Sequence, residues 1–317
     1  MTRILVTGAT GFIGKILCRE LLDADYEVVA TTRDSLGKDR LDGVKLLHVP
    51  DIGVYENWET SLDGVDVVAH LAGRAHVMKE RARDPLAAFR KVNTEGTERL
   101  ANAAAKSGVK RIVYLSTIKV NGGSTSFSPF TEEDPPAPQD AYALSKWEAE
   151  QALFGVAENA DLEAVVIRPP LVYGEGVKGN FLSLLKICKL SLPLPLGGAA
   201  NQRSLIYVGN LVDIIIKCLE HPGAAGQVFL ARDGEDLSTA ELIRRLAGAM
   251  ERPARLFSVP KPLLGLAGGL TGKKDMVSRL LDSLSVDDGK IRRKLGWVPP
   301  YAMEQGLSRT AAWFLSL

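Results

Sequence analysis

The sequence predicts an α/β protein built on a doubly wound parallel sheet, with a smaller, mostly helical lobe in its last third. Short β-rich runs alternate with longer helical patterns over the first two-thirds of the chain. Each β-rich run is a continuous apolar stretch, which is typical of parallel strands buried on both faces. After Arg168 the alternation stops, because prolines and glycines crowd residues 169–179 and 192–198 and helical patterns then dominate.

The expected elements follow one another in short steps. Strands are expected at Ile4–Thr7, Val28–Thr32, Leu46–Val49, Val65–Leu71, Arg111–Ser116 and Ala164–Ile167. Helices are expected near Phe12–Asp23, Glu56–Leu62, Leu86–Lys106 and Tyr142–Val156, and a capping box at Ser238–Glu241 opens another that runs to about Met250. Two later runs, Leu205–Val208 and Gln227–Leu230, are expected to return to the main sheet. We therefore expect a first domain over residues 1–168, with returning strands near 204–231, interleaved with a second lobe over residues 169–317.

Composition and charge exclude several classes of partner. Of the 317 residues, 46% are apolar and 24% are charged, which is ordinary globular composition. The formal net charge is +1, from 39 basic and 38 acidic side chains, and it gives no electrostatic case for nucleic acid or an anionic membrane. A phosphorylated small molecule is still compatible with this balance, because such a ligand needs only local charge.

The cysteines and the apolar runs indicate a reduced protein that does not span a membrane. Cys18, Cys188 and Cys218 stand singly in apolar periodic stretches, without metal or redox spacing, and are expected to be core thiols. No group of His, Cys and Asp has the spacing of a metal site. Met1 leads directly into the first strand, and the longest apolar run, Pro262–Leu270, is far shorter than the roughly 20 residues of a membrane span. We expect a cytoplasmic location and no membrane insertion.

A glycine-rich turn lies between the first strand and the first helix. It reads Thr7-Gly8-Ala9-Thr10-Gly11-Phe12-Ile13-Gly14. Gly8 allows a tight turn, Gly11 lets the backbone approach a pyrophosphate, and Gly14 permits close packing of helix on strand. The phosphates then sit at the N-terminus of the helix, where free amides and the helix dipole favour an anion. The turn therefore predicts a dinucleotide cofactor.

A tyrosine and a lysine stand four residues apart at the start of a later helix, in Tyr142-Ala143-Leu144-Ser145-Lys146, and so share one face. A phenol has a pKa near 10 in water, which is too high for a base at neutral pH. A neighbouring ammonium stabilises the phenolate and lowers that pKa, and a cationic nicotinamide adds to the effect. Such a tyrosine can exchange a proton with a substrate oxygen while hydride moves at the adjacent carbon. Tyr142 and Lys146 are therefore the expected acid–base couple.

These motifs, in this order, resemble the extended short-chain dehydrogenase/reductase superfamily. The spacing Gly-x-x-Gly-x-x-Gly is the form that this superfamily uses, and the resemblance covers essentially the whole chain. It implies contacts to the adenine from Asp51 and Ile52, and contacts to the cofactor from Tyr142 and Lys146. It also implies further cofactor contacts from residues after the fourth and sixth strands and on the helix between the fourth and fifth, namely Leu71, Ala72, Gly73, Asn93 and Pro169.

One position departs from the pattern of members that prefer NAD. Those members end the second strand with an acidic residue, which binds the ribose 2′-hydroxyl. Here the position is Thr32, followed by Arg33. A carboxylate would repel a 2′-phosphate, whereas a hydroxyl followed by a guanidinium could bind one. The expected cofactor is thus NADP(H) or NAD(H), and the alternative for Arg33 is a solvated arginine that stacks on adenine.

The fifth strand ends in Leu115-Ser116-Thr117, where the superfamily has a hydroxyl that hydrogen-bonds the reacting oxygen. Alignment through Val120-Asn121-Gly122, which resembles a Val-Tyr-Gly segment of sugar epimerases, selects Thr117 over Ser116. The alternative is that both hydroxyls satisfy local backbone groups.

The substrate side resembles nucleotide-sugar epimerases, dehydratases and reductases from Arg168-Pro169-Pro170 onward. The resemblance implies that Asn180 touches the nucleotide diphosphate and that Arg203 is its best phosphate ligand, because a guanidinium fork suits paired phosphate oxygens. Arg279 is a weaker second candidate, and a structural salt bridge is the alternative for both arginines. Arg74 and His76 follow the fourth strand and should face the nicotinamide side of the cleft, although a lone histidine is more often structural.

The resemblance implies hydride transfer at C4 of a nucleotide-linked hexose of the UDP series, in bacterial surface-polysaccharide biosynthesis. A dehydratase is disfavoured, because those enzymes carry Asp-Glu after the catalytic threonine and this chain has Ile118 and Lys119. A UDP-4-keto-6-deoxy-sugar 4-reductase is slightly preferred over a UDP-sugar 4-epimerase with retained NAD, because Thr32 and Arg33 suit an exchanging NADPH.

Two readings of other kinds stay open. The chain could be an NADP-binding redox sensor without turnover, although such members have lost the tyrosine or the lysine. It could be a flavonoid- or steroid-type reductase, against which Asn180 and Arg203 argue for a phosphorylated substrate. The superfamily also implies a homodimer that packs the long helices following the fourth and fifth strands.

Overall fold

The computed structural model describes residues 1–34, 41–75, 82–270 and 274–317, and a few side chains between 261 and 279 are outside the described part. Its strands are β1 Arg3–Thr7, β2 Glu27–Thr32, β3 Lys45–His48, β4 Val67–His70, β5 Arg111–Leu115, β6 Glu163–Arg168, β7 Leu171–Tyr173, β8 Arg203–Tyr207, β9 Val228–Leu230 and β10 Asp236–Leu237. The α-helices are α1 Phe12–Asp23, α2 Trp58–Ser61, α3 Pro85–Arg90, α4 Gly96–Lys106, α5 Ala141–Ala157, α6 Gly179–Lys189, α7 Val208–Glu220, α8 Thr239–Ala249, α9 Lys261–Leu270, α10 Lys274–Leu281, α11 Gly289–Leu295 and α12 Met303–Leu315. A π-helical turn, η1, spans Lys91–Glu95, and short 3₁₀ turns, η2 and η3, span Ile118–Val120 and Pro222–Ala224.

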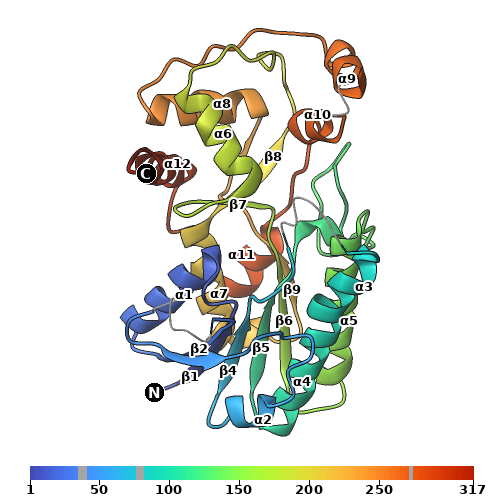
Figure 1. Ribbon diagram of the computed structural model, residues 1–317, viewed down its shortest axis with the longest axis vertical. Coiled ribbons are helices and arrows are strands. Elements are labelled where there is room, and N and C mark those ends of the chain that lie inside the picture. Colours follow the sequence, from blue (N-terminus) through green and yellow to red (C-terminus); the bar gives the residue numbers. More distant parts are fainter. Residues whose placement is uncertain (35–40, 76–81, 271–273) are drawn as a thin grey trace.

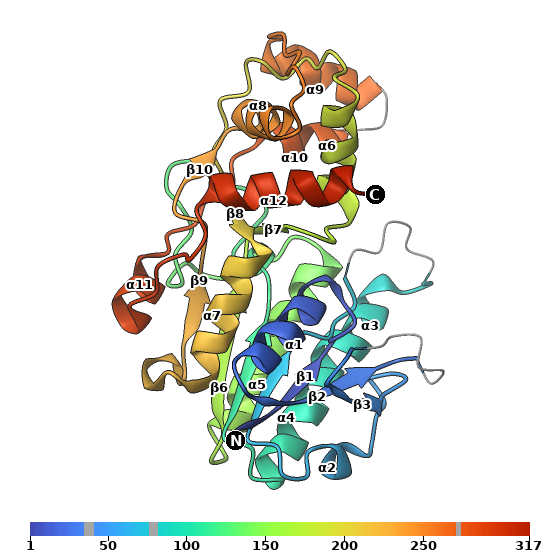
Figure 2. The ribbon, with the colours of Figure 1, turned by 90° about the vertical axis from the view of Figure 1, so that its left-hand side faces the viewer.

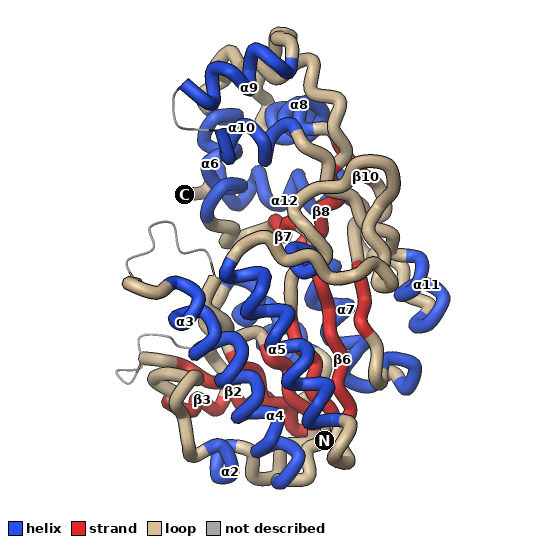
Figure 3. Tube along the Cα trace, turned by 90° about the vertical axis from the view of Figure 1, so that its right-hand side faces the viewer, coloured by secondary structure: helices blue, strands red, loops and turns tan. Residues whose placement is uncertain are grey.

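Seven parallel strands form the main sheet in the order β3-β2-β1-β4-β5-β6-β9. Helices cover both faces: α1 and α7 lie on one (Figure 2), and α3, α4 and α5 lie on the other (Figure 3). The strand order reverses between β1 and β4, so the loops that follow these two strands open a crevice at the carboxyl edge. The predicted doubly wound fold is confirmed, and its crevice is where a ligand should bind.

The core consists of apolar residues on both faces of this sheet. On one face, Leu17 and Leu21 of α1 and Ile214 of α7 are fully buried against strand residues such as Val6. On the other face, Leu100 of α4 and Leu153 of α5 pack against the opposite set of strand side chains. Because both faces are covered, each strand is a continuous apolar run rather than an alternating one, as the sequence predicted.

The second lobe stands on the carboxyl edge of the sheet (Figure 1). It contains a small sheet in the order β10-β8-β7, with α6, α8, α9, α10 and α12 around it. Its own core includes Phe181 of α6, Leu246 of α8 and Leu307 of α12. Ser238 caps α8, since its hydroxyl accepts from the Glu241 amide at 3.0 Å, and the predicted helix start is confirmed.

One predicted strand takes a different partner. The run Leu205–Val208 was expected in the main sheet, but β8 pairs with β7 in parallel and with β10 in antiparallel fashion, inside the second lobe. The run Gln227–Leu230 does return: β9 pairs with β6 at the edge of the main sheet. A short apolar run has the same pattern in either sheet, so periodicity alone could not assign the partner of β8. The division at residue 168 stays a prediction.

The three cysteines are buried thiols without disulfide partners, as predicted. Burial raises the pKa of Cys18 and of Cys218 to about 12, and that of Cys188 to about 11. Such thiols are neutral at physiological pH and unreactive. Within the described residues, no helix is both long enough and apolar enough to cross a bilayer.

Candidate active site

The turn after β1 is shaped by contacts that exclude side chains. Gly8 has a φ of 71°, and a Cβ added there would lie 2.7 Å from the Ala72 amide nitrogen in the loop after β4. A Cβ at Gly14 would lie 2.3 Å from the carbonyl oxygen of Gly8. The turn and the first helical turn therefore require glycine at both positions.

This turn fits the pyrophosphate of a dinucleotide. The N-terminus of α1 begins after Gly11, and no side chain caps it. The backbone amides near Phe12 and Ile13 therefore point toward the crevice with the positive end of the helix dipole behind them. The glycines keep the backbone bare at the place where the phosphates would approach, so this chain's residues suit the cofactor that the sequence predicted.

A buried hydrogen-bond chain connects the β1 turn to the helix between β4 and β5. The Thr7 hydroxyl accepts from the Ala72 amide at 3.1 Å and lies 2.6 Å from His70 Nδ1. His70 Nε2 lies 2.9 Å from the Thr97 hydroxyl, which donates to the Asn93 carbonyl at 2.6 Å. Because Thr97 uses its proton on Asn93, it must accept from His70, so we assign the Nε2–H tautomer.

His70 is therefore structural rather than catalytic. Burial, with a smaller effect from the charge of Lys146, lowers the pKa of His70 to about 3. A neutral imidazole with one donor and one acceptor matches the two threonines on either side, and both ring nitrogens are used. His70 closes β4 opposite Thr7 in the strand register, which places the two side chains together.

Asn93 lies in η1, where the chain forms a π-helical turn between α3 and α4. Its side-chain oxygen accepts from the Arg74 amide at 2.7 Å, and its nitrogen donates to the Ser145 hydroxyl at 2.9 Å. The Ser145 hydroxyl in turn donates to the Tyr142 carbonyl at 2.8 Å. Asn93 thus holds the loop after β4 against the first turn of α5, which carries the predicted catalytic couple.

Lys146 is buried, with 4% of its surface exposed, beside the carboxyl end of β5. Its ammonium donates to the Leu115 carbonyl at 2.7 Å and lies 3.9 Å from the centre of the Tyr114 ring. Burial lowers the pKa of Lys146 to about 7, against the opposing effect of the Glu150 carboxylate. Lys146 is thus held on the face of α5 that it shares with Tyr142, at the edge of the crevice.

Tyr142 behaves differently from the expectation drawn from the sequence. Burial raises its pKa to about 12; a hydrogen bond with Thr117 lowers the pKa, and the charge of Asp140 raises it. The sequence analysis expected the ammonium of Lys146 to lower this pKa. In the polypeptide burial is the largest cause and raises the pKa instead, because it disfavours the charged phenolate.

The structure distinguishes the two hydroxyls that follow β5. Thr117 hydrogen-bonds with the Tyr142 phenol, and its catalytic role stays a prediction. Ser116 points the other way and donates to the buried Glu150 carboxylate. Glu150 also receives two guanidinium nitrogens of Arg168, and Arg168 donates to the Asn121 side chain at 2.9 Å.

This buried network was missed by the sequence analysis. Glu150 stands four residues after Lys146, on the same face of α5, which was the available signal. Asp140 was also missed: its carboxylate caps α5 through the Ala143 amide at 2.8 Å and pairs with Lys119 at 2.7 Å. Glu150 and Asp140 orient the turn that carries Thr117 without being candidates for proton transfer.

The other predicted cofactor residues surround the crevice. Thr32 is buried at the end of β2, and its hydroxyl accepts from the Asp34 amide at 3.0 Å, while Arg33 is exposed. Asp51 follows β3 and pairs with Lys91 at 3.2 Å. The remaining ones lie at the same edge or on its floor. The Leu71 amide donates to the Thr7 carbonyl, and the carbonyl of the buried Pro169 accepts from the Ile118 amide. Ile52 packs in the core, and a Cβ added at Gly73 would lie 3.2 Å from the side-chain oxygen of Asn93.

The predicted substrate residues lie further apart. Asn180 is exposed at the start of α6, and Arg203, on β8, donates to the Asp282 carbonyl at 3.1 Å. Burial lowers the pKa of Arg203, although the charge of Asp282 opposes this. Arg74 lies over the Phe89 ring at 5.4 Å, and Phe89 contacts Tyr142 at 5.9 Å. His76 and the side chain of Arg279 are outside the described residues.

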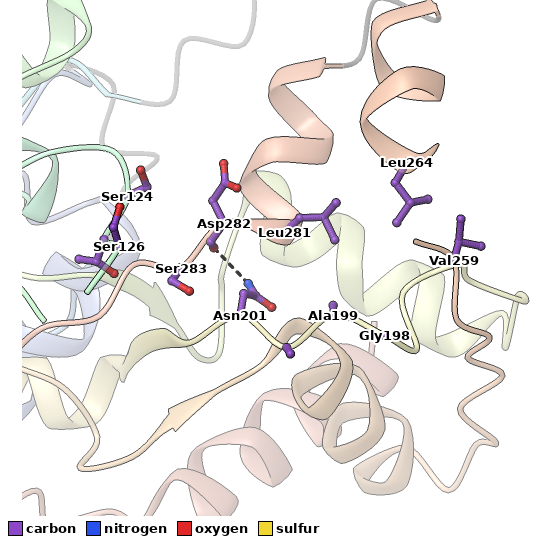
Figure 4. A pocket seen from close by; sticks show the side chains of 12 residues that line it. Ser124, Ser126, Gly198, Ala199, Asn201, Val259, Leu264, Leu281, Asp282 and Ser283 are labelled. Carbon is purple, nitrogen blue, oxygen red and sulfur yellow. Dashed lines mark hydrogen bonds between the residues drawn. The ribbon is translucent and has the colours of Figure 1, made fainter. Parts of the chain in front are cut away.

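A cavity of about 560 Å³ opens in the second lobe (Figure 4), and Arg203 donates to the carbonyl of Asp282, one of the residues that line it. One wall is polar and includes Ser124, Ser126 and Ser283, whereas Val259 and Leu264 line the opposite side. Residues 124–126 belong to the loop that leaves the Thr117 turn, and the Thr125 amide donates to the Ser283 carbonyl at 2.8 Å. The loop therefore connects the predicted catalytic hydroxyl to the cavity.

Comparison with known proteins identifies the family. Residues 4–231 match the NAD dependent epimerase/dehydratase family, and the chain belongs to it. The chain is 46% identical over 315 residues to a UDP-glucose 4-epimerase of Vibrio cholerae, a match that covers 98% of this chain and 95% of the relative. It is 30% identical over 325 residues to an N-acetyl-α-D-glucosaminyl-diphospho-ditrans,octacis-undecaprenol 4-epimerase of Escherichia coli O157:H7, covering 97% and 93%.

The fold matches solved structures over its whole length. A UDP-glucose 4-epimerase of Thermotoga maritima, crystallised with UDP-glucose, superposes with a TM-score of 0.79 at 24% identity and covers 99% of both chains. The family membership confirms the predicted resemblance and makes the protein an NAD-dependent enzyme of the nucleotide-sugar epimerase/dehydratase type.

We expect Tyr142→Phe to lower kcat by at least about a hundredfold, because the variant keeps the ring and removes the group that exchanges a proton with substrate. Binding of dinucleotide, measured by fluorescence titration, should be retained. Tyr55→Phe is the matched control, since the Tyr55 hydroxyl contacts Ser61 at 3.0 Å rather than the crevice. Near-normal turnover by Tyr142→Phe would remove this residue from the proton-transfer role.

The lowered pKa of Lys146 makes stability depend on pH. Between a folded-state pKa of about 7 and the ordinary value of 10.5, the unfolded chain holds a proton that the folded chain has lost. The free energy of unfolding therefore rises with pH across this window, by at most about 1.4 kcal/mol per pH unit, and is flat below it. The free energy of unfolding of wild type and of Lys146→Met is measured with denaturant. From pH 7 to pH 10 the difference between the two should change in favour of the wild type. A pH-independent difference, like that expected for the exposed control Lys106→Met, would contradict the assignment.

We expect Arg33→Ala to weaken NADPH binding more than NADH binding, because Thr32 and Arg33 stand where an NAD-selective relative has a carboxylate. A charge-assisted contact to a 2′-phosphate contributes about 1.5–3 kcal/mol, so the ratio of the two dissociation constants should change roughly tenfold or more. Isothermal titration with both cofactors measures it, with Arg19→Ala on the exposed face of α1 as control. Equal effects on both cofactors would make Arg33 a stacking or solvated residue.

Proposed function

We propose that the protein is a UDP-sugar 4-epimerase that oxidises the C4 hydroxyl of a hexose and reduces the resulting ketone from the opposite face. The observation that carries this proposal is the 46% identity to a UDP-glucose 4-epimerase over nearly the full length of both chains. The sequence analysis slightly preferred a 4-keto reductase. The relatives favour the epimerase, which was its alternative, and we adopt it.

In this proposal each group of the site has a defined task. Tyr142 exchanges the proton of the C4 oxygen, and Thr117 hydrogen-bonds the same oxygen. Lys146, whose ammonium donates to the Leu115 carbonyl at the edge of the crevice, positions the cofactor ribose. The bound dinucleotide supplies hydride acceptance and return at its nicotinamide. Asn93 and Ser145 hold α5 so that the tyrosine faces the crevice.

The residues that follow Thr117 oppose a dehydratase. Elimination of water needs an acid and a base beside the sugar, and this chain has Ile118 and Lys119 there. Ile118 is buried, and the Lys119 ammonium is paired with Asp140 at 2.7 Å. Neither can act as a carboxylate general acid or base, so the site is suited to hydride transfer alone.

The cavity lined by Asp282, whose carbonyl accepts from Arg203, is the proposed site of the group that carries the sugar. Two of the relatives act on sugars attached through a diphosphate, one to a nucleoside and one to an undecaprenol, as their names state. A guanidinium next to a polar wall suits such a diphosphate. Asn180 is proposed as a further contact from α6. We propose a cytoplasmic homodimer in surface-polysaccharide synthesis, with α4 and α5 as the contact between subunits.

A 4-keto reductase is the second candidate, and Thr32 with Arg33 is the observation that favours it. An epimerase must keep its reduced cofactor bound until the sugar has turned over, whereas a reductase releases oxidised cofactor in each cycle. Loss of an acidic ribose ligand at β2 weakens retention, and an exposed guanidinium suits the NADPH pool.

One assay separates the two candidates. Purified enzyme is incubated with UDP-glucose, UDP-N-acetylglucosamine or a UDP-4-keto-6-deoxy sugar, with and without added NADPH, and products are followed by chromatography and absorbance. We expect interconversion of C4 epimers without added cofactor. Stoichiometric loss of NADPH with the keto-sugar, and no epimer interconversion, would replace the epimerase by the reductase.

A further inference from the structure

The outer end of the second lobe carries an exposed apolar surface. Among the described residues, twelve large apolar side chains are exposed, and five of them lie in two segments of this lobe: Leu190, Leu192, Phe257, Leu263 and Leu266. Scattered apolar residues are normal on a protein surface, but a local concentration of them marks an interaction site.

The two segments lie side by side. Residues 194–197 and 255–257 hydrogen-bond as neighbouring strands: the Leu194 amide donates to the Arg255 carbonyl at 2.9 Å, and the Gly197 amide donates to the Phe257 carbonyl at 2.9 Å. The two loops run together over the end of the lobe and reach α9 (Figures 1 and 2). Leu256 turns inward to the lobe core, so Phe257, half exposed, faces out.

Helix α9 continues the surface. Leu263 and Leu266 are 56% and 63% exposed and stand three residues apart, on one face of the helix, while Leu264 faces the cavity. Pro262 is exposed beside them. A helix whose outward face is apolar presents that face to a partner. We call the set Leu190, Leu192, Phe257, Leu263 and Leu266 the apolar end.

Basic side chains border the apolar end. Lys186, Lys189, Arg252 and Arg255 are exposed in the same two segments, against the single exposed acid Glu251 among their described neighbours. The overall net charge of +1 conceals this local excess, because the balancing acids lie elsewhere on the chain. An apolar surface bordered by lysine and arginine is complementary to lipid acyl chains beneath anionic headgroups.

We propose that the apolar end docks on the surface of an anionic lipid bilayer. The protein would lie on the membrane and not cross it, with Phe257, Leu263 and Leu266 reaching the acyl boundary and Arg252 and Arg255 at the headgroups. A protein partner or a second copy would not require the basic border. This docking goes beyond the proposed reaction and does not depend on whether the enzyme is an epimerase or a reductase.

Docking at this end brings the cavity next to the membrane. Val259 and Leu264 line the cavity, and they stand between Phe257 and Leu266 in the sequence. Phe127, fully exposed, follows Ser126 across the cavity. The polar wall of the cavity lies across it from Leu264 of α9 (Figure 4), so a diphosphate group that enters past α9 would meet the serine side chains.

The test is sedimentation of the full-length protein with vesicles. Vesicles of phosphatidylcholine alone are compared with vesicles of equal parts phosphatidylcholine and phosphatidylglycerol, at low and high salt. We expect binding to the anionic vesicles, weakened by salt. The triple variant Phe257→Ser/Leu263→Ser/Leu266→Ser should lose roughly tenfold or more in affinity. The variant Arg252→Glu/Arg255→Glu should also lose binding, through charge alone.

The matched control is Val54→Ser/Val298→Ser/Leu317→Ser, which removes three exposed apolar side chains elsewhere and should bind like wild type. Turnover of a water-soluble UDP-sugar should be equal in all variants, which separates failure of docking from failure of the proposed reaction. Absence of binding to anionic vesicles, or undiminished binding by both the triple variant and the charge variant, would overturn the proposal. A vesicle-free dimer that the triple variant converts to monomer would assign the apolar end to a second copy instead.

Discussion

The candidate site depends on one chain of buried hydrogen bonds that begins at the turn after β1. It passes from Thr7 through His70 and Thr97 to Asn93, and continues through Ser145 to the backbone of Tyr142. Each hydroxyl in it donates to one acceptor, and the direction is fixed because Thr97 gives its proton to a carbonyl. A change in the imidazole's protonation would break the pattern, and burial keeps that imidazole neutral. The glycine turn and the catalytic helix are thereby held in one frame, although more than a hundred residues separate them in the sequence.

Much of this arrangement could be predicted, because it follows from local chemistry. The glycine turn, α1 with its observed bounds, and the Tyr142–Lys146 pair are short patterns that need only their neighbours in sequence. The single helix expected over Leu86–Lys106 was less accurate: the chain forms α3, a π-helical turn and α4. One extra residue in a helical turn hardly changes the apolar periodicity, so the sequence pattern does not reveal the π-helical turn. This turn carries Asn93, which contacts Arg74 and Ser145.

The remaining errors come from long-range packing. The partner of β8 depends on how the second lobe folds over the sheet, and no pattern within five residues carries that information. The pKa of Tyr142 depends mainly on burial, which the spacing of Tyr142 and Lys146 in the sequence does not reveal. The Glu150–Arg168 pair joins α5 to β6, and it became visible only when the two elements were placed together. Glu150 accepts from Ser116 and so turns that hydroxyl away from the crevice. Thr117 is then the hydroxyl beside Tyr142.

The ion pair of Lys119 and Asp140 sets the charge around the Tyr142 phenol. Asp140 caps α5 and its charge raises the pKa of Tyr142, so on its own it would leave less of the phenol ionised at neutral pH. The Lys119 ammonium is bound to that carboxylate and lies 5.9 Å from the centre of the Tyr142 ring, which offsets part of the negative charge. Because the Asp140 carboxylate is held by the helix cap and by Lys119, we propose that it takes no part in an elimination. The helix cap at Asp140 and the lysine that follows Ile118 therefore support the proposed transfer of a proton at one oxygen and a hydride at its carbon.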